Sequence, residues 1–198
     1  MKSNKIAILG SGQFGTALAN SLLISKKNNV CLFSRDQAQE IEIRLTKKNS
    51  ALFPNIVLNE RLIVTTKFSE LRDYDIIFLA VPSFAIEQLI SNSKKFIKKN
   101  TIVVNLSKGF VSANMTITDY LNQELPFCSI NSFKGPTFAI ELIHGATSIF
   151  TLGYDKKESL EVLQNIVHNT NIYLDFTTDI IGVEILSVIK NIYAIMIG

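Results

Sequence analysis

Three glycines near the start of the chain have the spacing of a phosphate-binding turn. The segment Gly10-Ser11-Gly12-Gln13-Phe14-Gly15 follows the apolar run Ile6–Leu9 and precedes a segment with helical periodicity. In such a turn the first glycine permits a tight bend, the second lets the backbone approach a pyrophosphate, and the third lets the helix pack closely on the strand. Free N–H groups at the start of the helix then hold the anion. The spacing therefore predicts a dinucleotide site at residues 10–15, with a glycine turn that binds nothing as the alternative.

The residues after the second apolar run indicate which dinucleotide would bind. Val30–Phe33 is followed by Ser34, Arg35 and Asp36. An acid at this strand end usually holds the ribose hydroxyls of NAD, whereas a guanidinium suits the 2′-phosphate of NADP. We therefore expect NADP(H), with Arg35 as a cofactor contact. NAD(H) stays open because Asp36 is only one residue further on, and Arg35 has a surface arginine as its alternative.

Three later segments place polar groups directly after predicted strands. They are Val81-Pro82-Ser83, Ser107-Lys108-Gly109 and Lys134-Gly135-Pro136-Thr137-Phe138-Ala139. Ligands of doubly wound sheets bind where the carboxyl ends of the strands meet, so these segments are expected to share one crevice. From there Lys108 could reach a phosphate or a carbonyl oxygen, although a solvated loop lysine is an equally good interpretation.

A second lysine lies in the last helical segment, Ile180–Ile197. Glu184, Ser187, Lys190 and Asn191 are almost its only polar residues, and spacings of three and four put them on one side of a helix. This side is either the wall of an active site or simply the wet face of the helix. A helix so apolar elsewhere needs helices around it. We therefore expect the chain to stop just inside a second, helical domain, or to oligomerise.

Short β-rich runs alternate with helical segments along the whole chain, which is typical of a parallel sheet covered on both faces. The fold class predicted is α/β, a Rossmann-like doubly wound and mainly parallel sheet over residues 1–178. Residues 179–198 would form the first helix of a truncated all-helical domain. The expected strands are 6–9, 30–33, 62–64, 76–81, 101–105, 129–132, 147–152 and 172–176; the expected helices are 14–25, 37–47, 83–98, 115–123, a short one from 136, 156–167 and 179 onward.

Composition narrows the class of protein. The 198 residues are 47% hydrophobic with a net charge of +3, and paired lysines are scattered, so no basic face for nucleic acid is expected. Cys31 and Cys128 lie in apolar runs without metal-ligand spacing, which predicts buried thiols and no metal site. No apolar run suits a membrane span, and residues 10–13 interrupt any signal-peptide core. A cytoplasmic protein is expected.

Taken together, these segments resemble the bacterial-type family of NAD(P)-dependent glycerol-3-phosphate dehydrogenases. The similarity covers the whole chain. The matching segments are residues 10–19, Ser34-Arg35-Asp36, Ala80-Val81-Pro82-Ser83, Ser107-Lys108-Gly109-Phe110, Gly135-Pro136-Thr137-Phe138-Ala139-Ile140-Glu141, Gly182-Val183-Glu184 and Lys190-Asn191-Ile192-Tyr193-Ala194-Ile195.

The resemblance implies a reaction and a set of roles. The reaction is reversible reduction of dihydroxyacetone phosphate to sn-glycerol 3-phosphate, which supplies glycerophospholipid synthesis, by a homodimer in the longer parent protein. Lys190 is implied to be the catalytic acid and base and to bind substrate, with Lys108 touching both cofactor and substrate. The implied roles of the other residues are cofactor binding for Gly10, Gly12, Gln13, Phe14, Gly15, Arg35 and Ala139, and substrate binding for Gly135 and Thr137.

One departure from the family keeps other functions open. Family members continue into a helical domain, whereas this sequence ends eight residues after Lys190. The chain could therefore be a non-catalytic dinucleotide-binding module. A related two-domain dehydrogenase acting on another hydroxy acid is the third interpretation.

Overall fold

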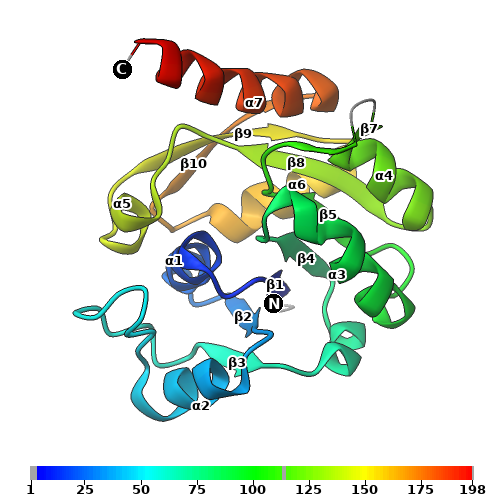
Figure 1. Ribbon diagram of the computed structural model, residues 1–198. Coiled ribbons are helices and arrows are strands. Elements are labelled where there is room, and N and C mark those ends of the chain that lie inside the picture. The colour runs from blue at the N-terminus through cyan, green and yellow to red at the C-terminus, as the bar shows by residue number, and fades with distance from the viewer. Residues whose placement is uncertain (1–3, 113–114, 198) are drawn as a thin grey trace.

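The computed structural model describes residues 4–112 and 115–197, with the backbone alone for residues 191–195 and 197. A central sheet of eight strands carries helices on both faces (Figure 1). The strands of this sheet are β1 (Asn4–Leu9), β2 (Asn28–Phe33), β3 (Ile63–Thr65), β4 (Ile76–Leu79), β5 (Ile102–Asn105), β8 (Ser129–Lys134), β9 (Ser148–Gly153) and β10 (Ile172–Thr177). The α-helices are α1 (Gln13–Leu22), α2 (Gln37–Thr46), α3 (Ile86–Ser93), α4 (Ile117–Glu124), α5 (Ala139–Ile143), α6 (Lys157–Val167) and α7 (Ile180–Ile197).

The strand order confirms the predicted doubly wound sheet. It runs β10-β9-β8-β5-β4-β1-β2-β3, and the six strands from β8 to β3 are all parallel. From β1 the chain first adds β2 and β3 on one side of the sheet and then β4, β5 and β8 on the other. The direction thus reverses between β1 and β4, and a crevice lies at the carboxyl ends of these two strands. β9 pairs antiparallel with β8, and β10 follows β9 in parallel.

Alternation along the strands explains the two hydrophobic cores. In β1, Ile6 and Ile8 face the core beneath α1, α5 and α6, whereas Ala7 and Leu9 face the core beneath α3 and α4. All four side chains are fully buried. A parallel strand covered by helices on both sides has to be apolar at every position, which is why Ile6–Leu9 is an unbroken apolar run.

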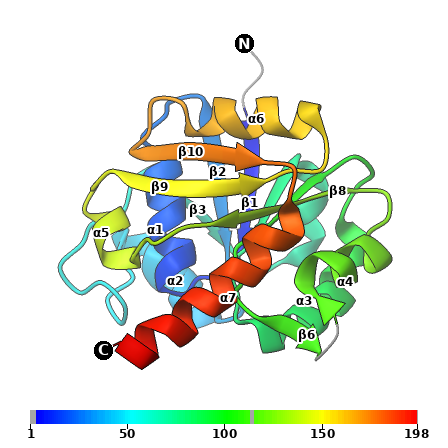
Figure 2. The ribbon, with the colours of Figure 1, turned by 90° about the horizontal axis from the view of Figure 1, so that it is seen from above.

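The last helix, α7, lies across β8 and β9 (Figure 2). Val183 is buried against the sheet, while Ile181, Ile185 and Leu186 are exposed. The predicted helix is confirmed as far as Ile197, and its apolar outer face is uncovered in this chain. Within residues 4–112 and 115–197, no helix has the length and apolarity that crossing a membrane requires.

Two local predictions were wrong, and one small element was missed. The helix expected over 83–98 is broken into a 3-10 turn (Ser83–Ala85), α3 and a second 3-10 turn (Lys94–Phe96). The helix expected from Pro136 begins only at Ala139, because Phe138 is extended. A small antiparallel hairpin, β6 (Phe110–Ser112) with β7 (Met115–Thr116), was not predicted, since it carries no period-2 pattern long enough to detect.

Candidate active site

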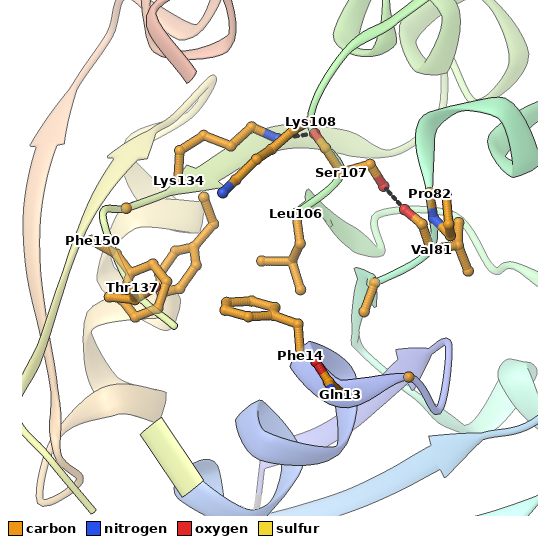
Figure 3. A pocket seen from close by; sticks show the side chains of 14 residues that line it. Gln13, Phe14, Val81, Pro82, Leu106, Ser107, Lys108, Lys134, Thr137 and Phe150 are labelled. Atoms are coloured by element: carbon orange, nitrogen blue, oxygen red, sulfur yellow. Dashed lines mark hydrogen bonds between the residues drawn. The ribbon is translucent and has the colours of Figure 1, made fainter. Parts of the chain in front are cut away.

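A cleft of about 360 Å³ opens at the carboxyl ends of β1, β4, β5 and β8 (Figure 3). This volume lies in the usual range for small-molecule sites, ~300–1,000 Å³. The cleft confirms that the segments after these strands meet in one place. Its lining residues are Gly12, Gln13, Phe14, Ala80, Val81, Pro82, Leu106, Ser107, Lys108, Phe133, Lys134, Gly135, Thr137 and Phe150.

The glycine turn forms one wall of the cleft, and each of its glycines has a different surrounding. Gly10 has a φ of +118°, and a Cβ there would lie 2.5 Å from the carbonyl oxygen of Ala80. A Cβ on Gly15 would collide with the carbonyl of Gly10, so α1 packs directly on the turn. A Cβ on Gly12 would meet open space. Gly12 is also the N-cap of α1, and no side chain caps the helix. The first N–H groups of α1 therefore face the cleft without an intramolecular side-chain acceptor.

A buried hydrogen-bond network braces the turn from behind. The Ser11 hydroxyl donates to Ser34 Oγ at 3.0 Å, and Ser34 donates to Gln39 Oε1 at 2.7 Å. Asn49, fully buried, donates to Thr16 Oγ1 at 3.1 Å. The network connects the glycine turn to the end of β2. Sequence reasoning missed Gln39 and Asn49, because neither belongs to a recognisable motif and both reach the turn only through the fold.

The two charged residues after β2 have different environments. Asp36 is the N-cap of α2, and its Oδ1 accepts a hydrogen bond from the Ala38 N–H at 2.8 Å. Arg35 is exposed and makes no hydrogen bond or ion pair with any described residue. Arg35 does not line the cleft itself. The Arg35 guanidinium is therefore available at the end of β2, while Oδ1 of Asp36 is engaged by the backbone N–H groups of α2.

A second hollow adjoins the cleft and contains the two lysines singled out by the sequence. Lys108, which is exposed, has its pKa lowered by partial burial of its amine and by the nearby charge of Lys190. Lys190 donates from Nζ to the carbonyl oxygen of Gly135 at 3.4 Å. The structure thus brings these two residues together, although 82 positions separate them in the chain (190 − 108). The residues that line this hollow are Lys108, Lys134, Gly135, Pro136, Thr151, Val183, Leu186, Ser187 and Lys190.

The loop after β8 contributes the remaining predicted substrate residues. A Cβ on Gly135 would lie 2.6 Å from the carbonyl oxygen of Ile149, so the loop can approach β9 only with glycine there. The buried hydroxyl of Thr137 has no hydrogen-bond partner among the described residues. A buried hydroxyl without a partner is costly unless a ligand or water satisfies it. Ala139 is the first residue of α5 and packs on the core beside the cleft rather than lining it.

Lys134 lines both hollows, and sequence reasoning did not select it. Only 6% of its surface is exposed. The pKa of Lys134 is lowered to about 7, because burial of the amine lowers it strongly, the charge of Glu184 raises it in part, and the charge of Lys108 lowers it. One feature of the sequence could have indicated that Lys134 is buried. Lys134 ends the strand Ser129–Lys134, in which most of the other positions are polar. Polar residues inside a strand covered on both faces indicate a buried network rather than plain core.

The predicted polar side of α7 does not share one environment. Glu184 is 3% exposed and accepts hydrogen bonds from Asn105 Nδ2 and from the Thr118 N–H, the latter at 3.1 Å. Ser187 is buried as well, whereas Lys190 is exposed. The side chain of Asn191 lies outside the described residues. The polar side of α7 therefore has two parts. Glu184 is buried and hydrogen-bonded to neighbouring elements, and Lys190, about two turns later, lines the second hollow.

Within the part of the chain that the structure describes, no three His, Cys, Asp or Glu residues gather as a metal site would require. Both cysteines are buried and unpaired with each other, as expected. The charged residues that line the cleft and the adjoining hollow are three lysines, Lys108, Lys134 and Lys190. Such a site suits an anionic ligand and developing negative charge on oxygen.

Known proteins share both the sequence and the fold. Residues 5–160 match the family described as NAD-dependent glycerol-3-phosphate dehydrogenase N-terminus. A relative named glycerol-3-phosphate dehydrogenase (NAD(P)+) from Fusobacterium nucleatum is 36% identical over 98% of this chain and 59% of its own length. A relative of the same name from Rickettsia typhi is 34% identical over all of this chain and 62% of its own.

Solved structures agree with the sequence comparison. The crystal structure of glycerol-3-phosphate dehydrogenase from Coxiella burnetii superposes with a TM-score of 0.87 and 26% identity, over 94% of this chain and 57% of that protein. The chain thus spans about 60% of the length of the relatives it matches. By the match over residues 5–160, it belongs to the family of NAD-dependent glycerol-3-phosphate dehydrogenases and contains the N-terminal part that defines it.

Proposed function

We propose that the cleft binds NADP(H), with the pyrophosphate at the glycine turn. Three features support the fit. The start of α1 is uncapped, the space in front of Gly12 is open, and the buried hydroxyl of Thr137 lacks a partner. Gly10, Gly12, Gln13, Phe14 and Gly15 would form the cradle, because backbone N–H groups at a helix start hold phosphate well. Ala139 would act indirectly, by fixing the helix that follows the Thr137 loop.

The residues after β2 favour NADP(H) over NAD(H). The Asp36 carboxylate caps α2 and is therefore less able to accept bonds from ribose hydroxyls. The exposed Arg35 guanidinium can form paired hydrogen bonds with a 2′-phosphate. The hydroxyl of Ser34 does not repel such a phosphate, as a carboxylate at the same position would.

For the reaction we propose reversible reduction of dihydroxyacetone phosphate to sn-glycerol 3-phosphate. The family and the names of the relatives support this substrate, and the full reaction belongs to a protein of their length. The nicotinamide supplies the hydride when it is bound. The substrate has an anionic phosphate group and a carbonyl group. The lysines that line the hollow beside the cleft could interact with the phosphate and with the carbonyl oxygen. Gly135 lines both the cleft and the hollow, Thr137 lines the cleft, and both would contact the substrate.

Lys190 is the proton carrier in this proposal. Reduction of a ketone leaves negative charge on its oxygen, and an ammonium group can stabilise that charge and donate the proton. The Gly135 carbonyl accepts a hydrogen bond from Lys190 Nζ at 3.4 Å and so directs the amine toward the loop after β8. Lys108 adds a second positive charge, and its own pKa is lowered by burial and by Lys190. The charge of Lys190 thus favours release of a proton from Lys108.

The observation that carries the proposal is the meeting of three remote segments. The uncapped start of α1, the loop of Lys108 and the helix of Lys190 border adjoining hollows, as dinucleotide and substrate would require. A glycine turn used only for packing would leave no reason for two lysines to converge beside it.

Two measurements test the proposal. Fluorescence titration with NADPH tests the cofactor site in this chain, and NADPH oxidation with dihydroxyacetone phosphate tests the reaction. In a protein of the relatives' length, the change equivalent to Lys190→Ala should leave NADPH binding intact and lower turnover by ~10²–10⁴-fold, the usual contribution of a general acid. Lys99→Ala, which removes an exposed lysine far from both hollows, serves as the matched control. Near-normal turnover in Lys190→Ala would show that another group carries the proton.

A non-catalytic dinucleotide-binding module is the second candidate. The observation in its favour is the span of only about 60% of the matched relatives. NADPH binding by this chain without turnover, together with turnover in a chain of the relatives' length, would assign this role to the 198-residue chain.

A further inference from the structure

Lys134 is a buried cation whose hydrogen bonds connect two strand ends. It closes β8, and its Nζ donates to two backbone carbonyls at the end of β5, those of Asn105 at 3.2 Å and Ser107. Ser107 in turn donates from Oγ to the carbonyl of Val81 at 2.5 Å (Figure 3). The residue that follows Ser107 is Lys108. The ammonium group of Lys134 therefore fastens the loop that carries Lys108.

The same network reaches the helix that carries Lys190. Asn105 accepts from Lys134 through its backbone oxygen and donates through its side chain to Glu184 of α7. Ser132, two residues before Lys134, also donates to Glu184, at 3.5 Å. Glu184 is buried, so its negative charge needs a nearby positive charge to offset the loss of water. Lys134 is the cation whose pKa responds to Glu184.

We propose that Lys134 is a positioning residue: it fixes the Lys108 loop to the end of β8 and, through Asn105 and Glu184, to α7, and thereby sets the separation of Lys108 and Lys190. The functional consequence rests on the proposed function, in which these two lysines face the substrate. The structural part, a loop held by one buried ammonium group, does not. It can therefore be tested without substrate or cofactor.

The strength of this attachment depends on the protonation of Lys134. Charge-assisted hydrogen bonds are about twice as strong as neutral ones. The pKa of Lys134 is lowered to about 7, so the amine is charged below this pH and neutral above it. The other charged groups that face it are Glu184 from α7 and Lys108 from the loop after β5, with Lys190 on the same hollow. The loop is therefore held more firmly at pH 6 than at pH 8.

Hydrogen exchange of the chain without ligand tests the proposal. Peptides covering residues 106–112 report the loop, and peptides from α1 (Gln13–Leu22) serve as the internal reference. After correction for intrinsic rates, loop exchange in the wild type should rise from pH 6 to pH 8. In Lys134→Met it should be about tenfold or more faster at pH 6, the factor expected for one lost charge-assisted hydrogen bond, and independent of pH. Loop exchange equal to the wild type at pH 6 would overturn the proposal.

A second variant covers the case in which Lys134→Met unfolds. Glu184→Gln keeps the size of the side chain and one of its two acceptor oxygens, and removes the charge that raises the pKa of Lys134. The rise in loop exchange should then occur at a lower pH than in the wild type, with α1 unchanged. An unshifted pH profile would refute the assignment. An NADPH titration of the wild type is run separately, so that failure of the proposed cofactor site and failure of the Lys134 attachment give different results.

Discussion

Gly12→Ala should separate ligand binding from folding at the glycine turn. Gly12 has φ −69° and ψ −176°, which alanine adopts without strain, and a Cβ there meets no atom within 4 Å. The free energy of unfolding should therefore stay within about 0.5 kcal/mol of the wild type. The methyl group would instead occupy the space in front of the first N–H groups of α1.

The expected loss of NADPH affinity follows from the hydrogen bonds displaced. A hydrogen bond to a charged group contributes ~1.5–3 kcal/mol, and 1.36 kcal/mol is a factor of ten. Displacing the phosphates from one or two such bonds should raise the dissociation constant at least about tenfold. Fluorescence titration with NADPH, beside thermal unfolding of the same sample, measures both quantities.

Two other glycines supply the controls. Gly145→Ala replaces a residue with φ +81° and open surroundings, so it should cost ~1–2 kcal/mol of stability and leave NADPH binding unchanged. Gly10→Ala adds a steric conflict with the carbonyl of Ala80 to a φ of +118° and should disrupt the fold. If Gly12→Ala binds NADPH as the wild type does, the pyrophosphate does not lie at this turn and the reasoning fails.

Two further substitutions test the rim of the cleft and the core. Arg35→Ala should weaken NADPH binding by ~10–100-fold and leave NADH binding nearly unchanged, because only the 2′-phosphate loses a charged partner; equal losses for the two cofactors would place the 2′-phosphate elsewhere. Phe78→Ala removes a ring that is 1% exposed and in edge contact with Phe133 at 6.0 Å between centroids, and guanidinium unfolding should show a loss of ~3–5 kcal/mol. A loss of unfolding free energy below about 1 kcal/mol would contradict this estimate and would mean that neighbouring side chains fill the space left by the ring.

The sequence was informative where one local pattern has one structural meaning. The apolar run Ile6–Leu9 followed by the glycine turn predicted a buried strand, the start of a helix and a tight turn that joins them, and the structure confirms all three. Lys108 and Lys190 were selected separately, one as a strand-end residue and one from the polar side of a helix. Their proximity depends on the path of β9, β10 and α7, which periodicity does not encode.

The residues that the sequence did not reveal act through long-range contacts. Gln39 and Asn49 brace the glycine turn from loops and helices that have no motif of their own. Lys134 resembled one more lysine at a loop until the fold buried it beside Glu184. Hydrogen bonds between residues so far apart in sequence are fixed by tertiary packing, and single-sequence patterns report only on local periodicity.

The reversal at β9 determines how the second lysine reaches its place. Because β9 and β10 run opposite to the parallel strands, both end away from the cleft, and α7 begins beside Gly153 and returns across β8. The ten residue-to-residue steps from Ile180 to Lys190 carry the chain back by ~15 Å. The number of helical residues between Ile180 and Lys190 therefore fixes both how far the lysine lies along the helix axis and the direction in which its side chain points. Deleting one residue between Glu184 and Lys190 would shorten this part of α7 by only about 1.5 Å. The same deletion would rotate the Lys190 amine by about 100° around the helix axis, away from the Gly135 loop.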